Sequence, residues 1–309
     1  AKAGISRRLI DFVDTCVGHK KGGIAIVCVI VSCFFGAISG SGPATVAALG
    51  AVLIPAMVEQ GGFSAPFSTA LMATSSSVAI VIPPSIAFVV YASITGVSIA
   101  DMFMAGIVPG ILMGVALVIV VILEANKHDI KPSRKKASAK ERWSTFKDAF
   151  WGFLMPIIIL GGIYGGIFTP TESAAVAVVY GLIVSIFVYK EMTVERIKQI
   201  VIDSVKGTAN ILLLIMAATL FGYVLTVYNV PELFTSLMTS MIHSKITFLL
   251  FLNVLLIILG MLMDSGAIIL IVAPLVYPIA MSFGIDPVHL GCIIVFNLAV
   301  GQATPPFGN

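Results

Sequence analysis

The sequence predicts an all-α membrane protein built as an inverted repeat, with two re-entrant hairpins and broken helices. Of the 309 residues, 59% are hydrophobic and 11% are charged, and the mean hydropathy is +1.08. Short polar runs that break helices interrupt apolar segments at matching positions in two halves of the chain. Basic residues gather in three clusters, as is typical of loops on one membrane face. The net charge of +3 therefore does not indicate nucleic-acid binding.

The first hairpin is organised around the run Ser39–Thr45, which reads SGSGPAT. It separates the apolar segments Gly22–Ile38 and Val46–Met57. Each segment is about 15 residues long, short of the roughly 20 that a helix needs to cross a bilayer. Non-helical backbone is tolerated at membrane depth only where it is buried in protein or lines a cavity. We therefore expect a re-entrant hairpin whose tip is a candidate binding site.

The rest of the first half contains a broken span and an ordinary one. The segment Phe63–Thr95 is long enough to cross, but Thr74–Ser77 and Pro83–Ser85 are expected to interrupt it. The flanking segments are an amphipathic helix at the membrane surface (Ile5–Lys21), a span (Met102–Leu123) and a loop with eight Lys or Arg residues (Glu124–Asp148).

The second half repeats this order of apolar runs and breakers. It begins with two expected spans (Phe150–Phe168 and Ser173–Tyr189), followed by a basic connection (Lys190–Lys206) and a third span (Thr208–Tyr228). An amphipathic segment (Pro231–His243) comes next, and after it a second hairpin, formed by Ile246–Met263 and Ile268–Met281 and joined by Asp264–Ala267. The last helix (Val288–Val300) runs into the break Gly301–Pro306.

Three pairs of breakers define the internal repeat. Ser41-Gly42 corresponds to Ser265-Gly266, Pro55 to Pro278, and Pro83-Pro84 to Pro305-Pro306, at offsets of 224, 223 and 222 residues. Counting crossings places all three basic clusters on the cytoplasmic side, and the second hairpin then enters from the opposite face. Interrupted segments at matching positions of inverted halves indicate the binding site of a secondary transporter.

Five ordered motifs carry a resemblance to a known family. They are FGAISGSGPATVAA (35–48), IPPS (82–85), GIFTPTESAAVA (166–177), MDSGA (263–267) and ATPPFGN (303–309). Together they resemble the large membrane subunit of tripartite ATP-independent periplasmic (TRAP) transporters, and the similarity covers essentially the whole chain.

The resemblance implies sodium-coupled uptake of an organic acid through the bacterial inner membrane, with Na⁺ as the coupling ion and no other cofactor. It also implies two partners, a soluble periplasmic binding protein and a small four-helix membrane subunit, and an elevator-type motion of a hairpin-bearing transport domain. The expected division is an arm helix (1–21), the first half of the transport domain (22–97), scaffold spans (98–230) with the loop 124–148, a periplasmic arm helix (231–245) and the second half of the transport domain (246–309).

Comparison of the two repeats also predicts an incomplete chain. Three spans precede the second arm and none precedes the first, while a helix follows the first break and nothing follows Asn309. We expect about three crossings to be missing at the start and a helix and a half at the end, at roughly 20 residues per crossing.

Sodium is a hard cation that needs several oxygen ligands, and unwound backbone at a broken helix supplies carbonyls. The first expected sodium site places the tip against a break in the following span. Its residues are Ser39, Gly40, Ser41, Gly42, Thr45, Ser75, Ser76 and Ser77. Gly40 and Gly42 are expected to turn the backbone at positive φ, and Pro43 suits the first position of the next helix. A single serine in an apolar helix more often bonds to the preceding turn, which is the competing interpretation of Ser75–Ser77.

The second expected sodium site is related to the first by the repeat. Its residues are Asp264, Ser265, Gly266, Gly301, Gln302, Ala303 and Thr304. Asp264 is an acidic residue deep in apolar sequence, which makes it a functional candidate. It is equally suited to cap the helix that follows, and an N-capping carboxylate could also bind the ion.

The solute is expected to bind through its carboxylate at the N-terminal ends of half-helices that begin at Pro43 and Pro84. The expected solute-binding residues are Ser41, Pro43, Pro83, Pro84, Ser85, Pro305 and Pro306. Sialic acid and C4-dicarboxylates both fit such a tip. The other deep acid, Glu172, completes a capping box with Thr169 and is assigned a structural role. Cysteine and histidine spacing indicates no transition-metal site.

Two other functions remain to be weighed. A stand-alone sodium/dicarboxylate or citrate-type symporter would share this architecture and need no binding protein. An intramembrane protease would need paired aspartates, a Ser/His pair or a zinc motif, and the sequence offers none of these. A transporter is therefore favoured over an enzyme.

Overall fold

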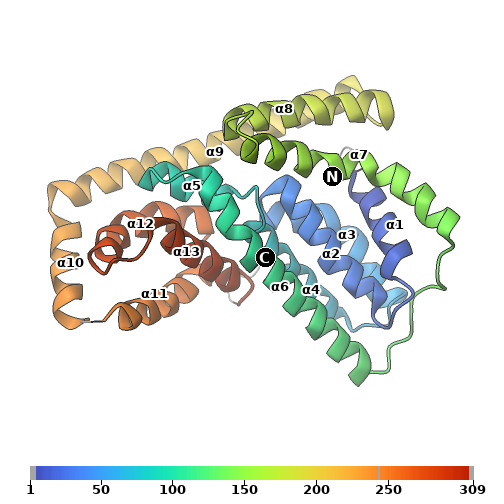
Figure 1. Cartoon of the computed structure of the whole chain (residues 1–309), viewed down its shortest axis with the longest axis horizontal. Helices are drawn as coiled ribbons and strands as arrows, with labels where there is room; N and C mark the ends of the chain where they lie inside the picture. Colours follow the sequence, from blue (N-terminus) through green and yellow to red (C-terminus); the bar gives the residue numbers. More distant parts are fainter. Residues whose placement is uncertain (1–4, 243, 306–309) are drawn as a thin grey trace. The chain divides into compact units, whose positions relative to one another are not determined.

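The computed structural model describes residues 5–242 and 244–305, and this part of the chain is helical with no strand. Seven of its helices or helix pairs are long and apolar enough to cross a membrane. Both findings confirm the prediction of an all-α membrane protein. The chain divides into two compact units (Figure 1), which are described separately.

The first unit holds residues 5–85 and 107–193. Its elements are α1 (Ile5–Val17), α2 (Gly23–Ser39), α3 (Gly42–Glu59), α4 (Ala65–Val81), most of α6 (Ile99–Lys127), α7 (Ala139–Tyr164) and α8 (Pro170–Ile183), which ends in the π-helical turn η1 (Val184–Val188). Helix α2 packs against α1, α3 and α4, and α7 packs against α1 and α8. Apolar residues of these helices, among them Leu9, Val27, Leu53, Met57 and Met72, form one buried core.

The second unit holds residues 86–106, 194–242 and 244–305. Its elements are the start of α6, α5 (Ile86–Thr95), α9 (Val194–Val227), α10 (Val230–Met241), α11 (Lys245–Gly260), α12 (Ser265–Ser282) and α13 (Pro287–Gln302). Helix α12 contacts α5, α9, α10 and α13, and α11 lies against α13. Tyr91 is fully buried in this unit, and its hydroxyl donates to the carbonyl oxygen of Pro287 at 2.8 Å.

Both hairpins are present as helix–tip–helix units. Their four helices are 16 to 18 residues long. Helices α3 and α12 are longer than the segments that the sequence suggested, α2 has the expected length and α11 is shorter. At 1.5 Å per residue they span about 24–27 Å, slightly less than the hydrocarbon core of a bilayer. Their depth in the membrane remains a prediction.

One expected interruption is absent, and two segments that the sequence prediction separated form one helix. Helix α9, of 34 residues, includes most of the connection Lys190–Lys206 and of the span Thr208–Tyr228. Only Gly207 separates the two segments, and a lone glycine costs a helix about 1 kcal/mol relative to alanine, too little to break it. Helix α4 likewise runs through Thr74–Ser77 without interruption and ends at Val81, so the span Phe63–Thr95 is broken only at Ile82–Ser85.

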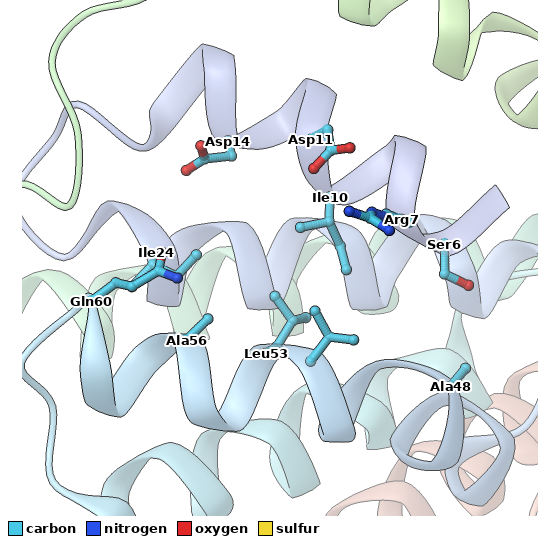
Figure 2. A pocket seen from close by; sticks show the side chains of 11 residues that line it. Ser6, Arg7, Ile10, Asp11, Asp14, Ile24, Ala48, Leu53, Ala56 and Gln60 are labelled. Atoms are coloured by element: carbon cyan, nitrogen blue, oxygen red, sulfur yellow. The ribbon is translucent and has the colours of Figure 1, made fainter. Parts of the chain in front are cut away.

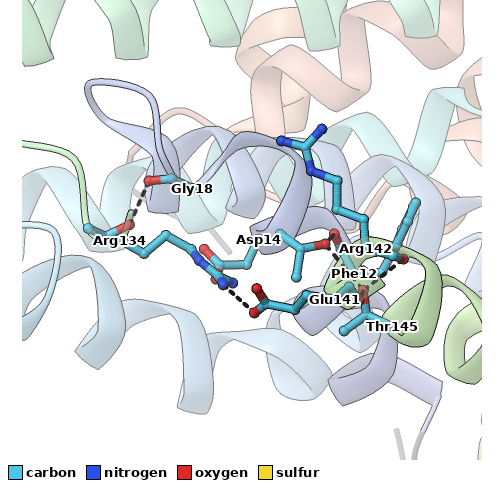
Figure 3. Close-up of polar contacts among 9 residues, drawn as sticks. Phe12, Asp14, Gly18, Arg134, Glu141, Arg142 and Thr145 are labelled. Atoms are coloured by element: carbon cyan, nitrogen blue, oxygen red, sulfur yellow. Dashed lines mark hydrogen bonds and ion pairs between the residues drawn. The ribbon is translucent and has the colours of Figure 1, made fainter. Parts of the chain in front are cut away.

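The arm helix α1 is tied to the basic loop and to α7 by polar contacts (Figure 3). The guanidinium of Arg134 binds the carboxylate of Asp14, with 2.8 Å between Nη1 and Oδ2, and also the carboxylate of Glu141. Beside this pair, the Ser133 hydroxyl donates to the carbonyl oxygen of Gly18 at 3.1 Å. The loop therefore folds back onto the end of α1.

Candidate functional site

The first tip is a two-residue turn between α2 and α3. Gly40 ends α2 in the left-handed region at φ 63°, and its N–H donates to the Gly36 carbonyl at 2.7 Å. Ser41 is extended and caps α3, accepting from the Ala44 N–H at 3.5 Å. Gly42 is already helical as the first residue of α3, with Pro43 second. The expectation of a positive φ at Gly42 is therefore wrong, because one left-handed residue, Gly40, suffices to reverse the chain.

Three oxygens gather at this tip. The hydroxyl of Thr45 donates to the Ser41 carbonyl at 2.8 Å and lies 3.2 Å from the hydroxyl of Ser39. The Ser39 hydroxyl is in turn 3.4 Å from the same carbonyl. Thr45 is fully buried, while Ser39 and Ser41 are half-buried. Hydroxyl and carbonyl oxygens are the donors that hard cations prefer, so the tip has the chemistry that a sodium site requires.

The serines Ser75–Ser77 do not form the expected break. Ser76 and Ser77 donate their hydroxyls to the carbonyl oxygen of Ala73, at 2.6 Å and 3.4 Å, so they follow the competing interpretation of back-bonding within the helix. The hydroxyl of Ser75 is buried and has no hydrogen-bond partner among the described residues. No hydrogen bond joins these serines to the tip in the part of the chain that the structure describes.

Two close contacts fix the register of the hairpin on α4. A Cβ added to Gly36 would lie 2.6 Å from the Cα of Ala79, and one added to Gly50 would lie 3.7 Å from Met72. The contacts of Cys28 with Met72 and of Gly36 with Ala79 show that α2 and α4 run in the same direction. The first tip therefore lies toward the C-terminal end of α4, which is Val81, rather than beside Ser75.

The break itself is largely enclosed by protein. Pro83 and Ser85 are buried, Pro84 is half-buried and Pro43 on the tip is exposed. Ser85 donates its hydroxyl to the carbonyl oxygen of Ile80, and α5 begins at Ile86 rather than at Pro84.

The second tip begins α12 with an aspartate cap. The carboxylate of Asp264 accepts from the Gly266 N–H at 2.9 Å, which confirms the capping interpretation of this residue. Asp264 is exposed and Ser265 is buried. The oxygen Oδ1 of this carboxylate therefore serves the helix cap.

Helix α13 brings an amide side chain to this tip. Gln302 is buried, and its Nε2 donates to the Ser265 hydroxyl at 2.6 Å and lies 3.5 Å from Oδ2 of Asp264. Gly301 and Gln302 are still helical, so the break begins at Ala303, two residues later than expected. Thr304 donates to the Val300 carbonyl, Pro305 is exposed and Pro306 lies outside the described residues.

In each unit, the helix glycine that comes closest to the backbone of another helix follows the offsets of the repeat. In the first unit the pair is Gly36 and Ala79; in the second it is Gly260 and Gly301, where a Cβ on Gly301 would lie 2.8 Å from the Cα of Gly260. These positions differ by 224 and 222 residues, the offsets found in the sequence. In each unit the first arm of the hairpin therefore packs, through small residues, on the helix that precedes the break.

One polar pair between α11 and α13 was not predicted from the sequence. The amide of Asn297 on α13 donates to the side-chain oxygen of Asn253 on α11 and to the Ile293 carbonyl. The Asn253 amide donates to the Leu249 carbonyl at 2.6 Å. Two asparagines in apolar helices were the available signal, and the pair ties α11 to α13 about one to two helical turns from the glycine contact.

Three other residues considered in the sequence, Thr169, Glu172 and His289, lie at the starts of helices. Glu172 and Thr169 form the predicted capping box at the start of α8, with Thr169 N–H donating to the glutamate at 2.8 Å. His289 lies in the first turn of α13, which Asp286 caps. Within the described residues, no three His, Cys, Asp or Glu side chains are placed to hold a metal ion.

Comparison with known proteins identifies the family. Residues 1–309 match the family model described as "Tripartite ATP-independent periplasmic transporter, DctM component". The chain is 44% identical over 305 residues to the C4-dicarboxylate TRAP transporter large permease protein DctM of Pseudomonas aeruginosa, covering 99% of this chain and 71% of that protein. It is 43% identical to the isethionate TRAP transporter permease protein DctMQ of Oleidesulfovibrio alaskensis, covering 99% of this chain and 48% of that protein. It is 34% identical to the 2,3-diketo-L-gulonate TRAP transporter large permease protein YiaN of Escherichia coli, covering 99% and 72%.

The helical architecture, the two tips and these similarities agree with the resemblance carried by the five motifs. Membership in a permease family makes the protein a transporter of the inner membrane rather than an enzyme. The chain belongs to the DctM family, the large permease component of tripartite ATP-independent periplasmic transporters.

Proposed function

We propose that this permease imports an organic anion of the C4-dicarboxylate or sialic acid class by coupling its uptake to sodium. The observation that carries the proposal is the pair of tips, which gather oxygen ligands at positions related by the repeat. Coordinating ions with such tips at unwound backbone is a recurring solution in secondary transporters.

At the first tip, the proposed sodium ligands are the hydroxyls of Ser39 and Thr45 and the carbonyl of Ser41, whose oxygens lie 2.8–3.4 Å apart. The tip lies toward the C-terminal end of α4, where the helix dipole is negative and favours a cation. Because Ser76 and Ser77 already bond within α4, their hydroxyls would contribute only after rotating away from Ala73.

At the second tip, the proposed ligands are Asp264, Ser265 and backbone oxygens of the turn at Ala303 and Thr304. Gln302 orients Ser265 through its 2.6 Å hydrogen bond. An amide donor at this point leaves the lone pairs of the Ser265 oxygen and the carboxylate available to a cation.

The proposed solute class rests on charge. The relatives are named for C4-dicarboxylate, isethionate and 2,3-diketo-L-gulonate, all of which are organic anions. The N-terminal end of α3 favours an anionic group near Ser41 and Pro43. Considered separately, the N-terminal end of α5 favours one near Pro84 and Ser85. C4-dicarboxylates are the first class to test, because the 44% identical relative carries that name.

Two partners belong to the proposal, a soluble periplasmic binding protein and a small membrane subunit. The tripartite family and the relative named DctMQ, whose length the chain half covers, support them. The alternative is a symporter that works without a binding protein.

The test is uptake of radiolabelled succinate and sialic acid into proteoliposomes that contain the permease, its small subunit and the binding protein. We expect uptake of one of them to require both a sodium gradient and the binding protein. Equal uptake when potassium replaces sodium would refute sodium coupling. Uptake that is undiminished without the binding protein would favour the stand-alone symporter.

A further inference from the structure

The first unit contains a cavity of about 460 Å³ between the arm helix α1 and the hairpin (Figure 2). Helix α1 forms one wall and α3 the other, with Ile24 of α2 between them. The lining residues are Ser6, Arg7, Ile10, Asp11, Asp14, Ile24, Ala48, Val52, Leu53, Ala56 and Gln60. None of them belongs to either tip.

The α1 wall presents polar groups that lack protein partners. Ser6 is only 7% exposed, and its hydroxyl has no hydrogen-bond partner among the described residues. A buried hydroxyl without a partner costs free energy, so such a group usually indicates an absent ligand or water. Arg7 and Asp11 are exposed one helical turn apart, and neither forms an ion pair with a described residue. Asp14, by contrast, is occupied by Arg134.

The charges along this wall are ordered. Ser6 and Arg7 lie toward one end of the cavity, and Asp11 and Asp14 follow toward the other (Figure 2). Partial burial is the largest influence on Asp11 and raises the pKa of its carboxyl, which the nearby Arg7 partly offsets. A cation placed beside Asp11 would therefore be stabilised. The C-terminal end of α3, which closes at Gln60 on the Asp14 side, favours a cation for the same electrostatic reason.

The α3 wall is apolar and reaches the surface. Ala48, Leu53 and Ala56 line the cavity, and Val52 beside them is 53% exposed. An amphipathic arm helix with a polar face is expected to lie at the level of the lipid headgroups. The cavity therefore has an apolar wall on α3, and the opposite wall, on α1, carries charges of both signs.

We propose that this cavity binds one phospholipid with a primary ammonium headgroup, of the phosphatidylethanolamine type. Arg7 and the Ser6 hydroxyl bind its phosphate, the Asp11 carboxylate binds its ammonium, and an acyl chain follows Ala48, Val52 and Ala56. The lipid bridges α1 and α3, so it holds the arm helix against the first hairpin.

The charge pattern selects this headgroup over the other common ones. Phosphatidylglycerol has a phosphate for Arg7 but no cation for Asp11. Phosphatidylcholine has a cation, but its quaternary nitrogen lacks the N–H donors that a charge-assisted hydrogen bond to a carboxylate needs.

The test is native mass spectrometry of the permease purified from membranes in mild detergent and titrated with synthetic phosphatidylethanolamine, phosphatidylglycerol or phosphatidylcholine of identical acyl chains. We expect one saturable phosphatidylethanolamine per permease, bound at least about tenfold more tightly than either other lipid, which corresponds to 1.4 kcal/mol. The double variant Arg7→Gln/Asp11→Asn should lose this preference. Both side chains are exposed, so the variant should fold.

Two further variants complete the experiment. Glu195→Gln/Lys198→Gln removes one exposed charge of each sign from α9 and should leave phosphatidylethanolamine binding unchanged. Ala48→Leu fills the apolar wall without changing charge and should weaken binding of the lipid severalfold. The proposal is overturned if Arg7→Gln/Asp11→Asn binds phosphatidylethanolamine as the wild type does, or if phosphatidylglycerol binds as tightly and depends equally on these two residues.

Discussion

Replacing Asp264 by asparagine separates the two roles of this carboxylate. Its Oδ1 caps α12 by accepting from the Gly266 N–H at 2.9 Å. Asparagine keeps an oxygen at that position and caps helices about as well as aspartate. The fold should therefore be retained, and Asp264→Asn changes little except the charge.

The size of the effect follows from the charge that is lost. A full charge about 4 Å from a sodium ion contributes about 4 kcal/mol at an effective dielectric of about 20, and about 1 kcal/mol in bulk water. Asp264 is exposed, so the expected loss lies between these limits. At 1.4 kcal/mol per decade, sodium affinity should fall by about one to three decades, with a smaller effect on maximal rate.

The assay is uptake into proteoliposomes as a function of sodium concentration, with choline keeping ionic strength constant. Asp286→Asn is the matched control, because Asp286 caps α13 in the same unit by accepting from the His289 N–H, also at 2.9 Å. It should leave the sodium dependence unchanged. If Asp264→Asn also leaves the half-saturating sodium concentration within twofold of the wild type, the carboxylate charge has no role in sodium binding and Asp264 is a cap only.

Three other perturbations test the topology and the packing. In a background without the native cysteines, Lys136→Cys and Ser236→Cys should be labelled by an impermeant maleimide from opposite sides of sealed cells, and labelling from the same side would contradict the inverted topology. In Gly301→Val, the new side chain would meet the backbone of Gly260, because a Cβ at this position lies 2.8 Å from the Gly260 Cα. The variant should destabilise the protein by about 1–3 kcal/mol or more, measured as a lower melting temperature. The control Gly207→Val has open space around it and should cost well under half of that. Arg134→Gln removes both ion pairs that hold the basic loop and should accelerate cleavage of the loop by trypsin at its remaining lysines. Because the guanidinium is about a quarter exposed, the loss in global stability should be about 1 kcal/mol or less. An unchanged cleavage rate would show that the ion pairs do not hold the loop.

Local chemistry in the sequence predicted much of the architecture. Gly40 followed by Ser41 and Pro43 marks the end of one helix and the start of the next, and the structure has both ends there. The same holds for Asp264 before α12 and for the capping box at Thr169. These signals are reliable because a cap or a left-handed glycine satisfies backbone groups within a few residues along the chain.

Two predictions were wrong where polar residues occur within a helix that they do not end. Serines at 75–77 looked like a break, but hydroxyls that bond to the preceding turn leave the helix intact. Lys190–Lys206 was separated from the following span by its charge, although no residue between them could end the helix. Polarity alone does not terminate a helix when its backbone hydrogen bonds can continue.

The sequence by itself determined that this is a helical membrane protein with repeated hairpins, because hydropathy, breakers and caps act over short distances. Its five motifs carried the resemblance to a permease family. Only the tertiary structure decided which residues meet. The contact of Gly36 with Ala79 sets the first tip toward the C-terminal end of α4, and the bond from Gln302 to Ser265 completes the second tip. Such pairs depend on how far one helix slides along another, which is fixed by side-chain packing over the whole interface and leaves no mark in either segment alone.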